Sequence, residues 1–198
     1  FSKVKISTSK IEILKQKNFD LIDICSTTQV HDEHLKYISG LNLIIVIEKP
    51  IISLLKYKEK YIKFLKQLYR SNEKIIVCYP MLYLSEKFKK VFNFKNQIKI
   101  FKFDFLTGGK YTGKKICIDL MPHALSFVIK FFNNFNFKKN KFLIKSITIK
   151  KNDWKCEFIF QKIKFNFRLS EKLGRKTSLS IRLNDQITKR KTKYQNKK

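Results

Sequence analysis

The chain has 198 residues, 43% of them hydrophobic and 19 of them Phe, which excludes a disordered chain and allows a buried core in one domain or two small ones. Its formal net charge is +29, but only five of its 44 basic residues are arginine, the type suited to bidentate phosphate recognition. The many Lys, Asn, Ile, Phe and Tyr residues share A/T-rich codons, so we favour a compositional bias of the genome over nucleic-acid binding.

The four cysteines favour a reducing compartment. Cys25, Cys78, Cys117 and Cys156 form no Cys-x-x-Cys pair, and three of them lie in apolar, strand-like contexts, so we expect buried free thiols. No apolar run approaches the roughly 20 residues of a membrane span, and no signal peptide is visible. We therefore expect a cytoplasmic protein with no membrane partner. Because the chain starts inside a strand-like segment with Phe1, we also expect a fragment.

The first 80 residues alternate strand and helix patterns. The expected strands are 3–7, 20–25, 43–47 and 74–79, and the expected helices are 10–17, 32–39 and 53–70. Gly40 is expected to end the second helix. Lysines between the apolar positions of the third helix would also suit a membrane surface, but core packing is favoured. This alternation predicts a parallel α/β sheet with right-handed crossovers.

The pattern changes after residue 80. We expect a helix at 84–91, a strand at 98–105, a glycine-bearing loop at 107–113, a strand at 116–118 and a helix from Asp119 to residue 132, with Asp119 as cap and Pro122 in the first turn. Strands at 142–150, 154–161, 163–169 and 177–183, joined by short turns, predict an antiparallel sheet. Residues 189–198 read as a basic, disordered tail.

A β-branched run, Ile44 to Pro50, ends in a charged pair and a proline. It reads Ile-Ile-Val-Ile-Glu-Lys-Pro, and Pro50 stops the ladder because it has no amide donor. Glu48 and Lys49 are therefore expected at the carboxyl end of a strand, where ligands bind in open α/β sheets. Taken alone, the run favours a simpler interpretation, in which both charges are ordinary loop residues.

Two weaker patterns carry little chemistry. His31 and His34 are spaced three apart, as in some metal sites, but no Cys or His cluster completes a ligand set, so no metal is expected. Gly108, Gly109 and Gly113 resemble a phosphate-binding loop only superficially, because no helix is expected directly behind them.

Asp119 and His123 form a more specific pair. Four residues apart on a helix, their side chains face the same way. Histidine exchanges a proton near neutral pH, and a nearby carboxylate can orient it or hold a substrate hydroxyl. A capping Asp beside a hydrogen-bonded structural histidine explains the pair at least as well when it is taken alone.

Three motifs together resemble the Gfo/Idh/MocA oxidoreductases in kind, order and separation. They are Asp23 to His31, which reads Asp-Ile-Cys-Ser-Thr-Thr-Gln-Val-His, then Glu48-Lys49-Pro50, then Asp119-x-x-x-His123. The resemblance spans roughly two thirds of the chain. It implies a partial Rossmann-like dinucleotide-binding domain at 1–80 and a substrate and oligomerisation α+β domain at 81–188, with a mostly antiparallel open sheet that could support a homo-oligomer.

The resemblance also implies cofactor, substrate and residue roles. Members of the family use NAD or NADP to oxidise or reduce sugars, inositols, polyols and nucleotide-sugars. Lys49 would bind the reacting hydroxyl or carbonyl, His123 would be the acid/base, and Asp119 would orient the substrate. The residues that would line the cofactor are Ser26, Thr27, Thr28, His31, Glu48 and Pro50.

The chain departs from the family pattern at several positions. It has no G-x-G-x-x-G turn, Thr27 replaces a frequent proline, Met121 stands where glycine is usual, and Pro80 to Tyr83 replace an arginine-bearing segment. We therefore expect either a piece without the first Rossmann unit or a descendant that does not bind dinucleotide, and little dinucleotide affinity for this chain alone. The alternative function is a non-catalytic relic or basic module that binds nucleic acid or protein.

Overall fold

The computed structural model describes residues 19–41, 43–51, 59–70, 74–92, 97–133 and 141–191. The chain divides into two compact units, Phe1–Cys78 and Tyr79–Lys198. The expected strand 3–7, helix 10–17 and start of the third helix lie outside the described residues, as does the end of the expected tail.

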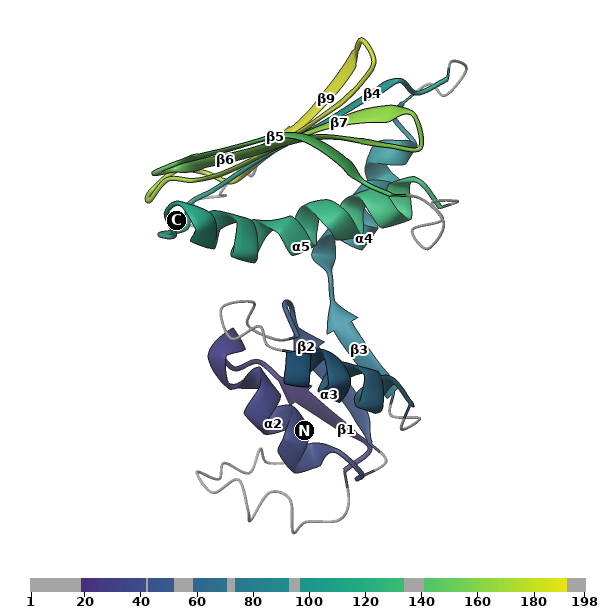
Figure 1. Ribbon diagram of the computed structural model, residues 1–198, viewed down its shortest axis with the longest axis vertical. Helices are drawn as coiled ribbons and strands as arrows, with labels where there is room; N and C mark the ends of the chain where they lie inside the picture. The colour runs from purple at the N-terminus through teal and green to yellow at the C-terminus, as the bar shows by residue number, and fades with distance from the viewer. Residues whose placement is uncertain are drawn as a thin grey trace, which may run out of the picture. The chain divides into compact units, whose positions relative to one another are not determined.

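Unit 1 contains a three-stranded parallel sheet (Figure 1). Its strands are β1 (Leu21–Ile24), β2 (Ile44–Glu48) and β3 (Lys74–Cys78), in the order β1-β2-β3. A short 3-10 helix η1 (Thr28–Val30) and helix α2 (His31–Ile38) connect β1 to β2, and helix α3 (Glu59–Arg70) precedes β3. In the register, Ile24 lies opposite Ile47 and Glu48 opposite Cys78. The predicted parallel α/β arrangement is confirmed.

The core of unit 1 follows from two periodicities. Alternate residues of β2, Ile45 and Ile47, are completely buried, as expected when successive side chains of a strand point to opposite faces. Leu35 and Ile38 of α2 pack against them. Because His31 precedes Leu35 by four residues, it belongs to the same buried stripe of α2, and Gly40 follows this helix with φ +88° as predicted.

Unit 2 contains a six-stranded sheet. Its strands are β4 (Ile100–Thr107), β5 (Leu143–Lys150), β6 (Asp153–Phe160), β7 (Ile163–Glu171), β8 (Ser178–Leu183) and β9 (Gln186–Lys191). They lie in the order β5-β6-β7-β4-β8-β9, and within these strands β4 runs parallel to β7 while the other pairs are antiparallel. Helices α4 (Pro80–Lys89) and α5 (Lys114–Phe131) lie on one side of the sheet (Figure 1). The mostly antiparallel C-terminal sheet is confirmed.

Phenylalanine dominates the core between α5 and this sheet. The side chains of Phe101 and Phe103 on β4 and Phe127 on α5 are completely buried. Phe127 and Phe131 stack with ring centroids 5.5 Å apart, and Phe103 meets Phe127 edge to face at 5.4 Å. Such pairs add roughly 0.5–1.5 kcal/mol to the gain from burial alone, so α5 is held to β4 mainly by aromatic contacts.

The start of α5 was predicted wrongly. The helix begins at Lys114, so the expected strand 116–118 is helical, Asp119 is not the cap, and Pro122 lies inside the helix. A proline there removes one backbone hydrogen bond and costs about 3 kcal/mol. Ile116, Leu120 and Ala124 form a buried stripe on both sides of it, and a fully buried leucine or isoleucine contributes about 1.5–3 kcal/mol. The free energy gained by burying these side chains therefore outweighs the cost of the proline inside the helix.

Two further boundaries were also wrong. Helix α4 begins at Pro80 rather than residue 84, because the first helical position needs no amide donor. Residue 189, where the tail was expected to begin, lies inside β9, and Lys189 pairs there with Ser180 of β8. A two-residue turn at Asn184 and Asp185 joins these strands, and the Asn184 side chain accepts the Lys99 amide hydrogen at 2.9 Å. That bond ties the hairpin to β4.

Two aspartates lie on the face of the six-stranded sheet that points away from α5. Their pKa values are shifted in opposite directions. Partial burial alone would raise the pKa of Asp153, but hydrogen bonds from Arg168 Nε at 3.0 Å and from the Ser170 hydroxyl outweigh it and lower that pKa. Asp104 lies opposite Arg168 across β4 and β7. Although its side chain reaches solvent, desolvation by its neighbours raises its pKa.

We predict opposite effects of Asp153→Asn and Asp104→Asn on the stability of unit 2. A lowered native pKa contributes stability above the unfolded value of about 3.9, and this stability is lost as pH falls through the native pKa. Asp153→Asn should lower the free energy of unfolding by roughly 1–3 kcal/mol at neutral pH, and the difference should shrink in acid. Asp104→Asn should be neutral or stabilising. Urea unfolding followed by fluorescence of the single tryptophan, Trp154 on β6, measures both; equal losses would contradict the assignment.

Candidate functional site

The carboxyl edge of the parallel sheet brings together most of the residues predicted to bind the cofactor. Since β1 and β2 are parallel neighbours with Ile24 opposite Ile47, the segments that follow them leave the sheet at the same edge. The first segment carries the hydroxyl residues Ser26, Thr27 and Thr28, and the second carries Lys49 and Pro50 just after Glu48. Parallel α/β sheets bind ligands at this edge.

These side chains are accessible to different degrees. Thr27 and Glu48 are exposed, whereas Ser26, Thr28 and Lys49 are half-buried. The Lys49–Pro50 peptide is cis. The edge therefore offers hydroxyl groups, one ammonium and one carboxylate.

His31 differs from the other predicted cofactor residues because it is not accessible at the sheet edge. Its side chain is completely buried, and its Nδ1 lies 3.0 Å from the Pro50 carbonyl oxygen while its Nε2 lies 2.9 Å from the Ser26 carbonyl oxygen. The ring thus joins the segment after β1 to the segment after β2 and has no exposed surface with which to touch a ligand. Nδ1 of His34 lies 3.0 Å from the Ser26 hydroxyl, so the two histidines do not face one metal position.

Asp119 and His123 belong to unit 2 and lie in the middle of α5 rather than in its first turn. Both side chains are half-buried. The His123 ring packs edge to face on Phe105 of β4, with centroids 5.7 Å apart. Pro122, directly before His123, donates no hydrogen bond to the Ile118 carbonyl four residues earlier.

The glycine-bearing loop after β4 is filled by a carboxylate of the chain itself. Glu171 of β7 is buried, and its Oε2 accepts the Tyr111 amide hydrogen at 2.7 Å. A Cβ atom at Gly109 would collide with this carboxylate. The glycine is therefore required for close approach to Glu171, and this loop is structural rather than a phosphate-binding site.

Gly109→Ala tests this close approach. Forcing a methyl group against the buried carboxylate should destabilise unit 2 by roughly 1–3 kcal/mol, as other overpacked sites do. The loss should be clearly smaller when Glu171 is also replaced by alanine. A double-mutant cycle measured by urea unfolding gives the coupling, and purely additive losses would show that the two residues do not meet.

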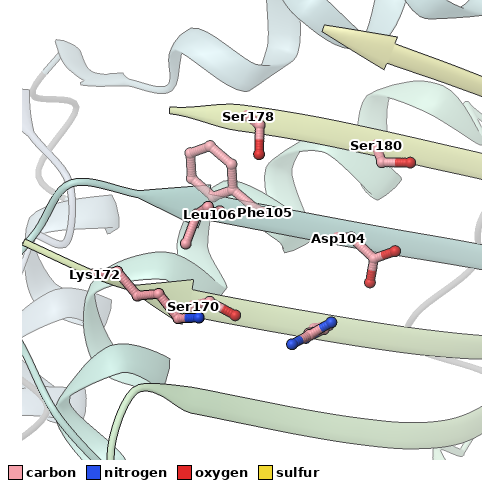
Figure 2. A pocket seen from close by; sticks show the side chains of 8 residues that line it. Asp104, Phe105, Leu106, Ser170, Lys172, Ser178 and Ser180 are labelled. Atoms are coloured by element: carbon pink, nitrogen blue, oxygen red, sulfur yellow. The ribbon is translucent and has the colours of Figure 1, made fainter. Parts of the chain in front are cut away.

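A cavity of about 230 Å³ opens on the strands of unit 2. Figure 2 shows Ser178 and Ser180 on one strand beside Asp104, Phe105 and Leu106, with Ser170 and Lys172 on the other side. Arg168, Asp104 and Ser180 are successive partners across β7, β4 and β8. Sequence reasoning missed this cavity because its polar residues resemble ordinary outward-facing strand residues, and their proximity depends on strand order and register.

Comparisons with known proteins connect the fold to dehydrogenases. No protein-family model and no curated protein matches the chain. Among solved structures, the dehydrogenase MviM from Clostridium difficile matches with TM-score 0.64 at 15% identity, covering 94% of this chain and 67% of that one. GenD2 from gentamicin A biosynthesis, in complex with NAD, matches with TM-score 0.68 at 11% identity, covering 98% and 62%.

A third match, the WlbA dehydrogenase from Thermus thermophilus in complex with NAD and UDP-GlcNAcA, has TM-score 0.61 at 14% identity and covers 88% of this chain and 61% of that one. The chain thus spans roughly two thirds or less of the length of these proteins. None of the described helices is both long and apolar enough to cross a membrane. The chain shares its fold with these proteins, two of which were crystallised with NAD.

Proposed function

We propose that the protein is an NAD(P)-dependent oxidoreductase of the Gfo/Idh/MocA type, acting on a sugar, polyol or nucleotide-sugar. This proposal rests mainly on one observation. The Ser26–Thr28 segment and the residues Glu48, Lys49 and Pro50 lie at the same edge of a parallel sheet, because they end or follow adjacent strands. The likeness in fold to GenD2 and WlbA, both crystallised with NAD, supports it.

The chemistry of this edge fits the nicotinamide and ribose end of a dinucleotide. The exposed Glu48 carboxylate can accept hydrogen bonds from ribose hydroxyls, and the hydroxyls of Ser26 and Thr28 can bond a carboxamide. Pro50 adds an apolar surface beside Lys49. The glycine-bearing loop after β4 does not offer a pyrophosphate site, because Glu171 fills it.

Lys49, His123 and Asp119 are the residues we propose for the chemical step. When bound, the cofactor supplies the hydride acceptor or donor. In this proposal the role of the Lys49 ammonium is to stabilise negative charge that develops on a substrate oxygen. The role of the His123 imidazole is to take or return a proton. The Asp119 carboxylate holds a neighbouring substrate hydroxyl. Phe105 packs against the His123 ring and restricts its rotation.

Substitution of Lys49 tests the proposal in the protein at its natural length. Lys49→Met should lower kcat by roughly 100- to 1,000-fold, as the loss of one charge-stabilising donor does elsewhere, while leaving the circular dichroism spectrum unchanged. The measurement is the loss of NADH absorbance with a panel of keto-sugars and nucleotide-sugars. Lys74→Met is the matched control, because Lys74 is exposed at the opposite, amino end of the sheet, and it should leave kcat unchanged.

His123→Gln provides the second arm, with an expected loss of roughly 100-fold or more because general acid–base catalysis contributes at least this much. Full turnover in both Lys49→Met and His123→Gln would contradict the assignment. A natural-length protein that binds no NADH and turns over no member of the substrate panel would favour a non-catalytic relic.

A further inference from the structure

We propose that His31 is a positioning residue that sets the place of Lys49 relative to the hydroxyl segment Ser26–Thr28 by cross-linking the two backbones. The cross-link is a property of the structure alone, whereas its consequence for hydride transfer rests on the function proposed above. Both parts can be tested separately.

The geometry of the ring carries this inference. The two ring nitrogens of His31 lie 2.9 and 3.0 Å from carbonyl oxygens of Ser26 and Pro50, residues on different segments. Pro50 directly follows Lys49, so the bond to its carbonyl holds the backbone beside the lysine. The side chain is completely buried, which removes competing water. Carbonyl oxygens only accept, so a neutral ring donates to one of them and a doubly protonated ring to both.

The helix that carries the ring is itself well anchored. Leu35 and Ile38 of α2 are buried on the same side as His31 and pack on the strands of unit 1. The core therefore fixes the start of α2. Through its contacts with the Ser26 and Pro50 carbonyls, His31 then restricts the motion of the segments after β1 and β2. No aliphatic or aromatic residue of similar size has two polar atoms on opposite sides of a rigid ring.

His34, almost one turn further along α2, provides an internal comparison. Its Nδ1 lies 3.0 Å from the Ser26 hydroxyl, and this contact reaches the segment after β1. The two histidines thus share an anchor on Ser26, but the bond to Pro50 belongs to His31. Removal of either ring should therefore loosen the segment after β1, whereas removal of His31 should also loosen the segment after β2.

Hydrogen–deuterium exchange tests the cross-link without any cofactor. In His31→Phe, amides in residues 25–30 and 48–51 should exchange roughly tenfold faster, the change expected for the loss of one or two hydrogen bonds. In His34→Phe, only residues 25–30 should exchange faster. Leu35→Ala is the control for a general loss of stability, because Leu35 is completely buried on the same helix and its loss should accelerate exchange throughout unit 1.

Two results would overturn the cross-link: unchanged exchange at residues 48–51 in His31→Phe, or a pattern identical to that of Leu35→Ala. If His31→Phe does not fold, His31→Gln carries the same test, because its amide can donate to one carbonyl and should accelerate exchange by less. Rescue of residues 48–51 by glutamine would support the bond to Pro50.

Kinetics of the natural-length protein test the consequence for the site. Misplacement of a reacting group by about 1 Å can lower the rate roughly 100-fold, so His31→Gln should lower kcat while KM changes little. A change confined to KM, or no change, would overturn the positioning role even if exchange at 48–51 increases. Absence of NADH-dependent turnover in the unsubstituted protein would instead contradict the proposed function, and the exchange result would still decide the cross-link.

Discussion

The backbone carbonyls of Ser26 and Pro50, which lie just beyond two strands of the parallel sheet, both contact the buried ring of His31. The strands β1 and β2 end at Ile24 and Glu48, so the carbonyls of Ser26 and Pro50 lie beyond the ladder and need other partners, since a buried carbonyl without one costs about 1–3 kcal/mol. Both ring nitrogens of His31 lie within hydrogen-bond distance of these carbonyls, and the ring donates to at least one of them. The shape of the carboxyl edge therefore depends on where α2 begins, and α2 is placed by Leu35 and Ile38 in the core.

The second unit places its functional candidates in a different way. The aromatic core between α5 and β4 holds the helix at a fixed register, and this register brings His123 onto Phe105. Pro122 interrupts the backbone hydrogen bonds of α5 beside the pair, but the buried residues before and after it keep the helix continuous. The proposed acid/base is thus oriented by packing, whereas the segment around Lys49 is held by hydrogen bonds to the backbone.

The sequence predicted most of the architecture of unit 1 because its signals are local. The run from Ile44 to Ile47 alternates buried and half-buried residues as a central strand does, and Gly40 adopts the positive φ that ends α2. The start of α5 was missed because Asp119 and Pro122 look like a helix start, while the stripe that decides the matter includes Ile116, further upstream. Strand β9 was missed because its six residues are largely basic and polar, and pairing with β8 determines its structure.

The candidate site was predictable in part for the same reason. Chain order indicated that Ser26 and Lys49 would share a sheet edge, because adjacent parallel strands end together. The buried state of His31 was not predictable from the motif, since it depends on the two carbonyls that converge on the ring. Likewise, Gly109 and Glu171 are 62 positions apart in the sequence, and their close approach follows from the parallel pairing of β4 with β7.

A titration of the chain with NADH, followed by two-dimensional ¹H–¹⁵N NMR, tests most directly whether the carboxyl edge of the parallel sheet is a nucleotide-binding edge. Weak, saturable shifts confined to residues 25–31 and 48–51, and reduced by Lys49→Met, are the predicted result. An absence of shifts at these residues, or saturable shifts confined to the cavity beside Asp104 and Ser180, would contradict it.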